Sequence, residues 1–146
     1  MFHRSGPAAG AAALLAFALL AVSTSMAQTT WYVDDDAPGD PGPGDPAVSD
    51  PLEDGTAAHP FDAIQEGINA AATGDEVVLA DGVYTGFGNK DLDFGGKDIT
   101  VRSASGDPST CVIDCQGEGR GFLFYSGESA AAVVTGLTIR NGYVAE

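Results

Sequence analysis

The sequence predicts an all-β fold, a parallel β-helix solenoid of about three coils with an N-terminal amphipathic capping helix. Three observations predict this fold. The segment DITVRS at residues 98–103 recurs as GLTIRN at residues 136–141. Short β-prone runs follow one another after residue 74, separated by Gly, Asp and Asn turns. One segment with helical periodicity precedes all of these runs.

Residues 1–27 have the features of an export signal. Arg4 lies in a short leading segment without acidic residues, and an unbroken apolar run at residues 8–22 follows it. Ser25 and Ala27 place small residues at the −3 and −1 positions of a cleavage site. A transmembrane anchor is the alternative, but it needs ~20 apolar residues. We expect cleavage after Ala27 and a secreted, periplasmic or cell-surface location.

Residues 28–58 combine a β-prone start, TTWYV, with a loop rich in Asp, Pro and Gly. The prolines and the like charges exclude a packed helix or a central strand in the loop. Its carboxylates are candidate Ca²⁺ ligands, because Ca²⁺ prefers oxygen ligands, although their spacing is not that of an EF-hand. A solvated acidic loop is the alternative. The candidate ligands are Asp34, Asp35, Asp36, Asp40 and Asp45.

The charge balance restricts the partners that the chain can bind. It has 21 acidic and 6 basic residues, which gives a formal net charge of −15. Nucleic-acid binding needs clustered Lys and Arg to replace counterions. We therefore expect neither nucleic acid nor an anionic membrane surface as a partner, and loss of Arg4 with the signal makes the mature chain more acidic.

Residues 59–146 are expected to form the capping helix and the first coils. Within them, residues 60–73 predict the helix, because Pro60 suits the first helical position and Gly74 suits the position after the last one. Apolar residues recur at three- and four-residue spacing on one face, and this stripe should cover the open end of the first coil. The stripe consists of Phe61, Ile64, Ile68 and Ala71 or Ala72.

Short strands are expected after the helix, in coils of about 20 to 25 residues with occasional loop insertions. Alternation in the two repeated segments predicts an interior ladder of aliphatic residues and an exterior face of Thr and Arg. Arg102 and Arg140 then occupy equivalent outward positions, and Asp81-Gly82 forms a turn. A β-sandwich is the alternative, but it gives no reason for the repeat. The expected strands are residues 76–80, 92–94, 99–103, 111–115, 122–126 and 137–141.

Cys111 and Cys115 lie four residues apart on one expected strand. On a strand their separation is ~13 Å, which exceeds what a disulfide can close. A bridge would require residues 112–114 to form a turn. Metal binding is disfavoured because neither His3 nor His59 lies close in sequence. We predict two buried, free thiols.

Several segments between residues 54 and 142 carry a family resemblance. They are DGT and HPF within residues 54–61, IQEGI at 64–68, GDEVVL and DGVY within 74–84, and the two repeated segments. Together they resemble the N-terminal cap and first coils of pectin-lyase-like right-handed parallel β-helix proteins. The resemblance and the usual chirality of parallel crossovers imply right-handed coils. It is specific for the fold and not for one function, because lyases, glycoside hydrolases and adhesins share it.

For catalytic members, the resemblance implies carboxylates that hold Ca²⁺ on an outer face and an Arg or Lys that acts as the base on an acidic polysaccharide. Here Arg102, Arg140 and Asp114 lie on the expected strands without clustered carboxylates at alternate positions. We therefore expect no catalytic and no cofactor-binding residues. The prediction is an exported, non-catalytic scaffold for cell-surface attachment, adhesion or glycan contact, with a polysaccharide or cell-surface glycan as partner.

The alternative function is an N-terminal fragment of a polysaccharide lyase or glycoside hydrolase whose catalytic coils are missing. No capping helix or polar last coil follows residue 141 in the sequence. An open β-helix end exposes strand edges and an apolar interior. We expect such an end to need further coils or a second protomer.

Overall fold

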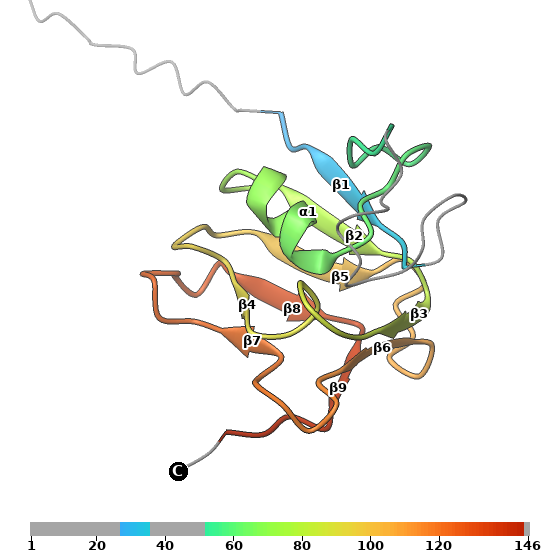
Figure 1. Cartoon of the computed structure of the whole chain (residues 1–146). Helices are drawn as coiled ribbons and strands as arrows, with labels where there is room; N and C mark the ends of the chain where they lie inside the picture. Colours follow the sequence, from blue (N-terminus) through green and yellow to red (C-terminus); the bar gives the residue numbers. More distant parts are fainter. Residues whose placement is uncertain (1–26, 36–51, 145–146) are drawn as a thin grey trace, which may run out of the picture.

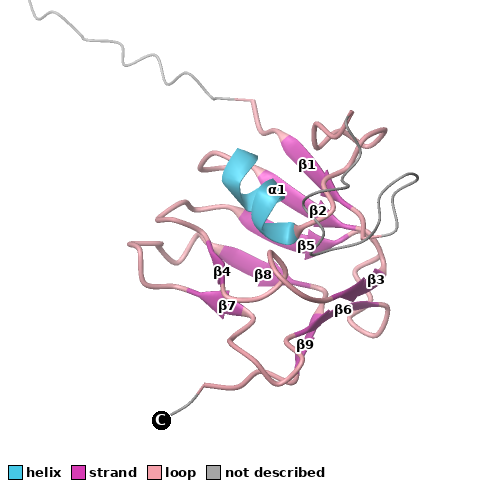
Figure 2. Cartoon of the chain, viewed as in Figure 1, coloured by secondary structure: helices cyan, strands magenta, loops and turns pink. Residues whose placement is uncertain are grey.

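A computed structural model describes residues 27–35 and 52–144 of the chain (Figure 1). The predicted signal at residues 1–27 lies outside this part of the chain, apart from Ala27. Within the described residues, no helix is long and apolar enough to cross a membrane. The elements, shown in Figure 2, are β1 (Thr30–Val33), α1 (Ile64–Ala70), β2 (Glu76–Leu79), β3 (Gly82–Tyr84), β4 (Leu92–Asp93), β5 (Thr100–Ser103), β6 (Cys111–Asp114), β7 (Phe122–Leu123), β8 (Val133–Thr135) and β9 (Thr138–Arg140).

The strands form three parallel sheets, with the orders β1-β2-β5-β8, β3-β6-β9 and β4-β7. From β2 to β6, each strand pairs with the strand three places further along the chain. Val77 in β2 pairs with Val101 in β5, 24 residues later, and Val101 pairs with Val134 in β8, 33 residues later. The chain thus passes through the three sheets in turn and returns to the first, which confirms an all-β fold built from parallel strands.

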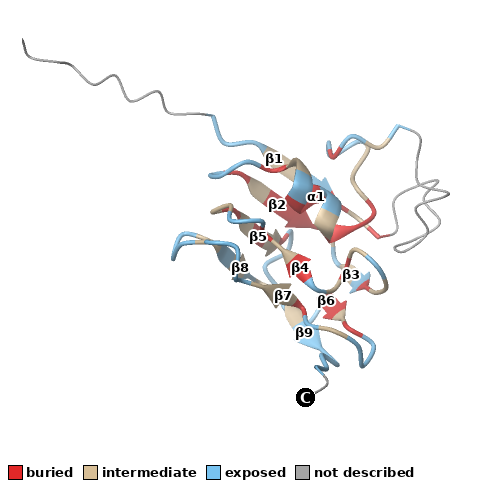
Figure 3. Ribbon diagram, turned by 60° about the vertical axis from the view of Figure 1, so that its left-hand side comes forward, coloured by how far each residue is buried: buried red, intermediate tan, exposed pale blue. Residues whose placement is uncertain are grey.

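The core lies between the three sheets and beneath α1. Ile64 and Ile68 of the helix are fully buried and belong to the same cluster as Val77 and Val101 of the first sheet. Burial decreases away from the helix, and Ile139 in β9 is exposed (Figure 3). The helix therefore covers one end of the apolar core, whereas the strands β7, β8 and β9 leave the other end more open.

Helix α1 is shorter than the predicted residues 60–73. Phe61 cannot be helical, because its N–H donates to the Tyr32 carbonyl and its own carbonyl accepts from the Asp34 N–H, both at 2.9 Å. At the other end, Ala71 has an extended backbone, and the Lys97 ammonium donates to helix carbonyls, including that of Ala71 at 3.0 Å. The helix is therefore limited at both ends by tertiary hydrogen bonds.

Gly67 in the middle of α1 has a packing role. A Cβ atom at this position would lie 2.8 Å from Val77 Cγ1 and 2.9 Å from Val33 Cγ2. The side chain is absent where the helix comes closest to the first sheet. The helix loses ~1 kcal/mol of intrinsic propensity at Gly67, and close packing against β1 and β2 compensates for it.

Two observed strands, β3 and β8, were missing from the prediction. Asp81-Gly82 was expected to form a turn, but Gly82 begins β3 and pairs with Cys111 of β6. A Cβ atom at Gly82 would overlap the Asp35 carboxylate, so glycine is used here for a close approach. Strand β8 was not predicted, because its three residues, Val-Val-Thr, are too few to show an alternation of apolar and polar positions.

The prediction that Arg102 and Arg140 are equivalent was also wrong. The first of the two repeated segments forms β5 and the second forms β9, which belong to different sheets. The alternation of apolar and polar residues is the same in every sheet that has one buried face, so similar sequences arise without stacking on each other. Cys111 and Cys115, by contrast, are buried and free as predicted. Burial raises the pKa of the Cys111 thiol to about 11.

Candidate functional site

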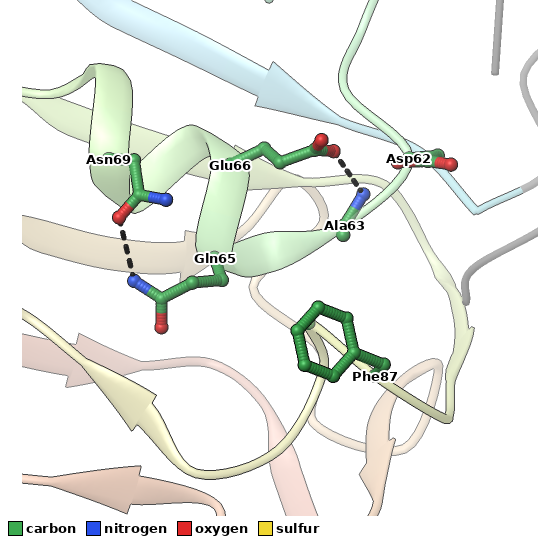
Figure 4. Close-up of a pocket in the computed structure, with 7 residues that line it drawn as sticks. Asp62, Ala63, Gln65, Glu66, Asn69 and Phe87 are labelled. Carbon is green, nitrogen blue, oxygen red and sulfur yellow. Dashed lines mark hydrogen bonds between the residues drawn. The ribbon is translucent and has the colours of Figure 1, made fainter. Parts of the chain in front are cut away.

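A groove of about 280 Å³ lies beside the first turns of α1. One wall is the helix and the residues just before it, and the other is the loop that joins β3 to β4 (Figure 4). The side chains that line it combine carboxylates, amides and one aromatic ring. They are Asp62, Ala63, Gln65, Glu66, Asn69 and Phe87.

The loop between β3 and β4 is fixed by the fully buried side chain of Asn89. Asn89 Oδ1 accepts a hydrogen bond from the Ile64 N–H at 2.9 Å, and Nδ2 donates to the Thr85 carbonyl at 3.1 Å. Gly88 has a φ of 82° and lies so close to the helix that an added Cβ would be 2.8 Å from Ala63 Cβ. The loop is thus held against the first turn of α1.

Phe87 projects from this fixed loop, and 81% of the residue is exposed. In Figure 4 its ring lies on the same side of Ala63 as Gln65, whereas the carboxyl groups of Glu66 and Asp62 lie on the other side. An aromatic ring gains nothing from the hydrophobic effect when it stays in water. The loop therefore displays a face that is available to a ligand.

The amide of Gln65 is used within the fold. Its Oε1 accepts from the Asp93 N–H at 2.9 Å, and its Nε2 donates to the Asp93 carbonyl and to Asn69 Oδ1, both at 3.0 Å. These bonds join α1 to β4 and hold the Asn69 side chain in place. The amide nitrogen of Asn69 then points away from Gln65 (Figure 4), where it can donate to a ligand.

Three carboxylates come together at the start of α1. Single oxygen atoms of Glu53, Asp62 and Glu66 lie within 4.8 Å of one another. Glu66 Oε2 also accepts from the Ala63 N–H at 3.3 Å. Asp62 is only 4% exposed. Burial, and then the hydrogen bond to Glu66 and its charge, raise the pKa of Asp62 to about 7.

This cluster can bind either a proton or a cation. A carboxyl group with a pKa near neutrality holds a proton over much of the physiological range. A divalent cation coordinated by the same oxygens would compete with that proton. The sequence analysis missed the cluster, although Asp62 and Glu66 stand four residues apart around a helix start, a spacing that places side chains on one face.

The Ca²⁺ ligands predicted from the sequence lie elsewhere. Asp34 and Asp35 follow β1, and the Asp35 carboxylate is buried against Gly82 of β3. The other three candidates, Asp36, Asp40 and Asp45, lie outside the residues that the structure describes. Binding of Ca²⁺ by this loop stays a prediction.

Arg102 and Arg140, the two arginines weighed above as a possible catalytic base, form ion pairs within their sheets. Arg102 Nη2 lies 3.2 Å from Glu76 Oε2 of the neighbouring strand β2, and Arg140 Nε lies 3.0 Å from Asp114 Oδ2 of β6. Asn141 Nδ2 donates to Asp114 Oδ1 at 2.9 Å. This hydrogen bond is the largest of the interactions that lower the pKa of Asp114. The charged groups on these outer faces connect adjacent strands.

Comparison with known proteins gave no match to a family model, to a curated protein or to a solved structure. The resemblance to pectin-lyase-like proteins therefore stays a prediction from the residues quoted above.

Proposed function

We propose that the chain is an exported, non-catalytic scaffold with a right-handed parallel β-helix fold, and that it contacts a glycan at the groove beside α1. The repeated passage through three parallel sheets supports the β-helix. The right-handed sense is that of nearly all parallel crossover connections. In this fold α1 is the cap, and β7, β8 and β9 form the coil that further coils or a second protomer would cover.

Glycan contact is supported by one observation above all. Phe87 is held exposed on a fixed loop and lines a groove whose other lining side chains include the amide of Asn69 and the carboxylate of Glu66. A ring that can stack on the apolar face of a sugar, together with side chains that bind hydroxyl groups, suits a carbohydrate. A scaffold role fits the outer faces of the sheets, where Arg102 and Arg140 are engaged by carboxylates.

Binding of the purified full chain to an immobilised panel of neutral, amino and acidic glycans tests this function. We expect reproducible binding to at least one class, with no change in the length of the glycan after incubation. Absence of binding to every class would contradict glycan contact. Cell fractionation with mass spectrometry of the N-terminus tests export separately, and a chain that begins at Gln28 is expected.

A glycoside hydrolase is the second candidate, and the pKa of Asp62 favours it. A carboxyl group that keeps its proton near pH 7 beside a second carboxyl group is the usual requirement for a general acid in glycoside hydrolysis. Release of reducing ends from the bound glycan, abolished in an Asp62→Asn variant, would establish this activity and refute the scaffold proposal.

A further inference from the structure

The exposure of Phe87 is specific to its loop. Phe124, the other strongly exposed phenylalanine, has a centroid distance of 5.1 Å to Phe94 and 6.2 Å to Phe122, so it extends an aromatic cluster of the core. Phe87 makes no such ring contact among the described residues. Because Asn89 and Gly88 fix the loop, the exposed ring lines the groove from a defined position.

The size of the groove limits its occupant. Its volume of about 280 Å³ lies just below the ~300–1,000 Å³ of pockets that enclose drug-sized ligands. One sugar ring fits this space, and the rest of an oligosaccharide would continue into solvent. Asn69 supplies a donor, Glu66 supplies an acceptor, and both can bind the hydroxyl groups of that ring.

The charge of the groove decides which sugars it accepts. Asp62 and Glu66 line it and Glu53 lies next to them. The nearby ammonium group of Lys90 is paired with Glu118 at 2.6 Å. A uronate placed beside Glu66 would be repelled by its like charge, and none of the residues that line the groove is a cation that could offset this repulsion. Without a bound cation, the groove is therefore unsuited to acidic polysaccharides.

We propose that the groove binds one neutral hexopyranose unit, which stacks a face on Phe87 and hydrogen-bonds to Asn69 and Glu66. This inference rests on the proposed glycan contact and specifies its site and its substrate class. It also differs from the acidic-polysaccharide chemistry that the family resemblance implies, because that chemistry needs an Arg or Lys as the base and none of the residues that line the groove is an Arg or Lys.

Titration calorimetry of the full chain tests the inference, with neutral gluco-, manno- and galacto-oligosaccharides and with oligogalacturonate as probes. We expect a neutral oligosaccharide to bind, and oligogalacturonate to bind at least about tenfold more weakly. Phe87→Ala should weaken binding of the neutral sugar about tenfold, the loss expected for one aromatic stacking contact. Asn69→Ala should weaken it by a similar factor, because a hydrogen bond is lost.

Tyr143→Ala is the matched control. Tyr143 is an exposed aromatic residue that follows β9. Strand β9 lies far from α1 (Figure 1), so the loss of this ring should leave binding unchanged. A neutral sugar that binds equally well to the Phe87→Ala and Asn69→Ala variants would overturn the proposed site and leave glycan contact standing. Preference for oligogalacturonate would overturn the substrate class. Absence of binding to any of these probes would refute the neutral-sugar site, and the wider glycan panel decides separately whether the chain contacts glycans.

Discussion

Replacing Asp62 with Asn tests whether one buried carboxyl group makes the stability of the fold depend on pH near neutrality. The side chain is almost fully buried and its pKa is raised to about 7, first by burial and then by Glu66. Asparagine has nearly the same shape, and its amide can still donate a hydrogen bond to Glu66 as the protonated carboxyl group does. The substitution therefore removes the titration and leaves the local geometry in place.

The sign follows from proton linkage. The pKa in the folded state is about 7, against the usual 3.8 of an aspartate, so between these values the folded state binds the proton more tightly than the unfolded state. The stabilising contribution is complete below about pH 4 and is lost as the pH rises through about 7. The full shift corresponds to at most about 4 kcal/mol. We expect about 2 kcal/mol, because water in the adjoining groove screens the carboxylate.

Urea unfolding, monitored by the fluorescence of Trp31, the single tryptophan, measures this effect between about pH 4 and about pH 8. The variant should match the wild type at the acidic end and exceed its free energy of unfolding by about 2 kcal/mol at the alkaline end. Asp54→Asn is the control, because hydrogen bonds from Thr56 lower the pKa of this exposed carboxylate. A difference between Asp62→Asn and wild type that stays constant with pH would refute the reasoning.

Phe94→Ala should lower the free energy of unfolding by about 3–5 kcal/mol, because Phe94 is fully buried; Phe124→Ala, at an exposed position, should cost clearly less in the same urea titration, and equal losses would contradict the assigned burial. Asn89→Ala should cost about 1–3 kcal/mol, since a buried helix N–H loses its acceptor, and it should speed hydrogen exchange of that amide; an unchanged exchange rate would contradict the role of Asn89 in fixing the loop. The thiols of Cys111 and Cys115 are buried and have raised pKa values, so a disulfide reagent should modify them only after unfolding, and rapid reaction of the folded chain would be the contrary result.

The regular part of the fold could be predicted from the sequence. Strands such as β2, β5 and β6 combine β-branched residues with buried positions, and they were placed within a residue or two of their observed bounds. The equivalence of strands could not be predicted in this way. Since each of the three sheets imposes the same alternation, the sequence of β9 resembles that of β5, although β9 pairs with β6.

The candidate site was harder to predict because tertiary contacts create it. Asp62 is buried directly after Phe61, which forms a parallel bridge with Val33 of the first sheet. Asn89 stands in a glycine-rich loop that the sequence does not distinguish from an ordinary turn, yet its amide oxygen accepts from a helix N–H 25 residues away. Neither contact produces a periodic signal along the chain.

The residues that carry the proposed function therefore lie where the repeating pattern is interrupted. Stacked strands tie their outward charges to each other, as Arg102 does with Glu76, and this leaves few groups for a ligand. The cap differs, because a short helix must be held over the open core by side chains that are not repeated. Gln65 and Asn89 supply these contacts, and the loop that they fix then carries Phe87 into solvent. Closing the core and building the groove thus depend on the same few hydrogen bonds, so a substitution that loosens the cap should weaken ligand binding as well as stability.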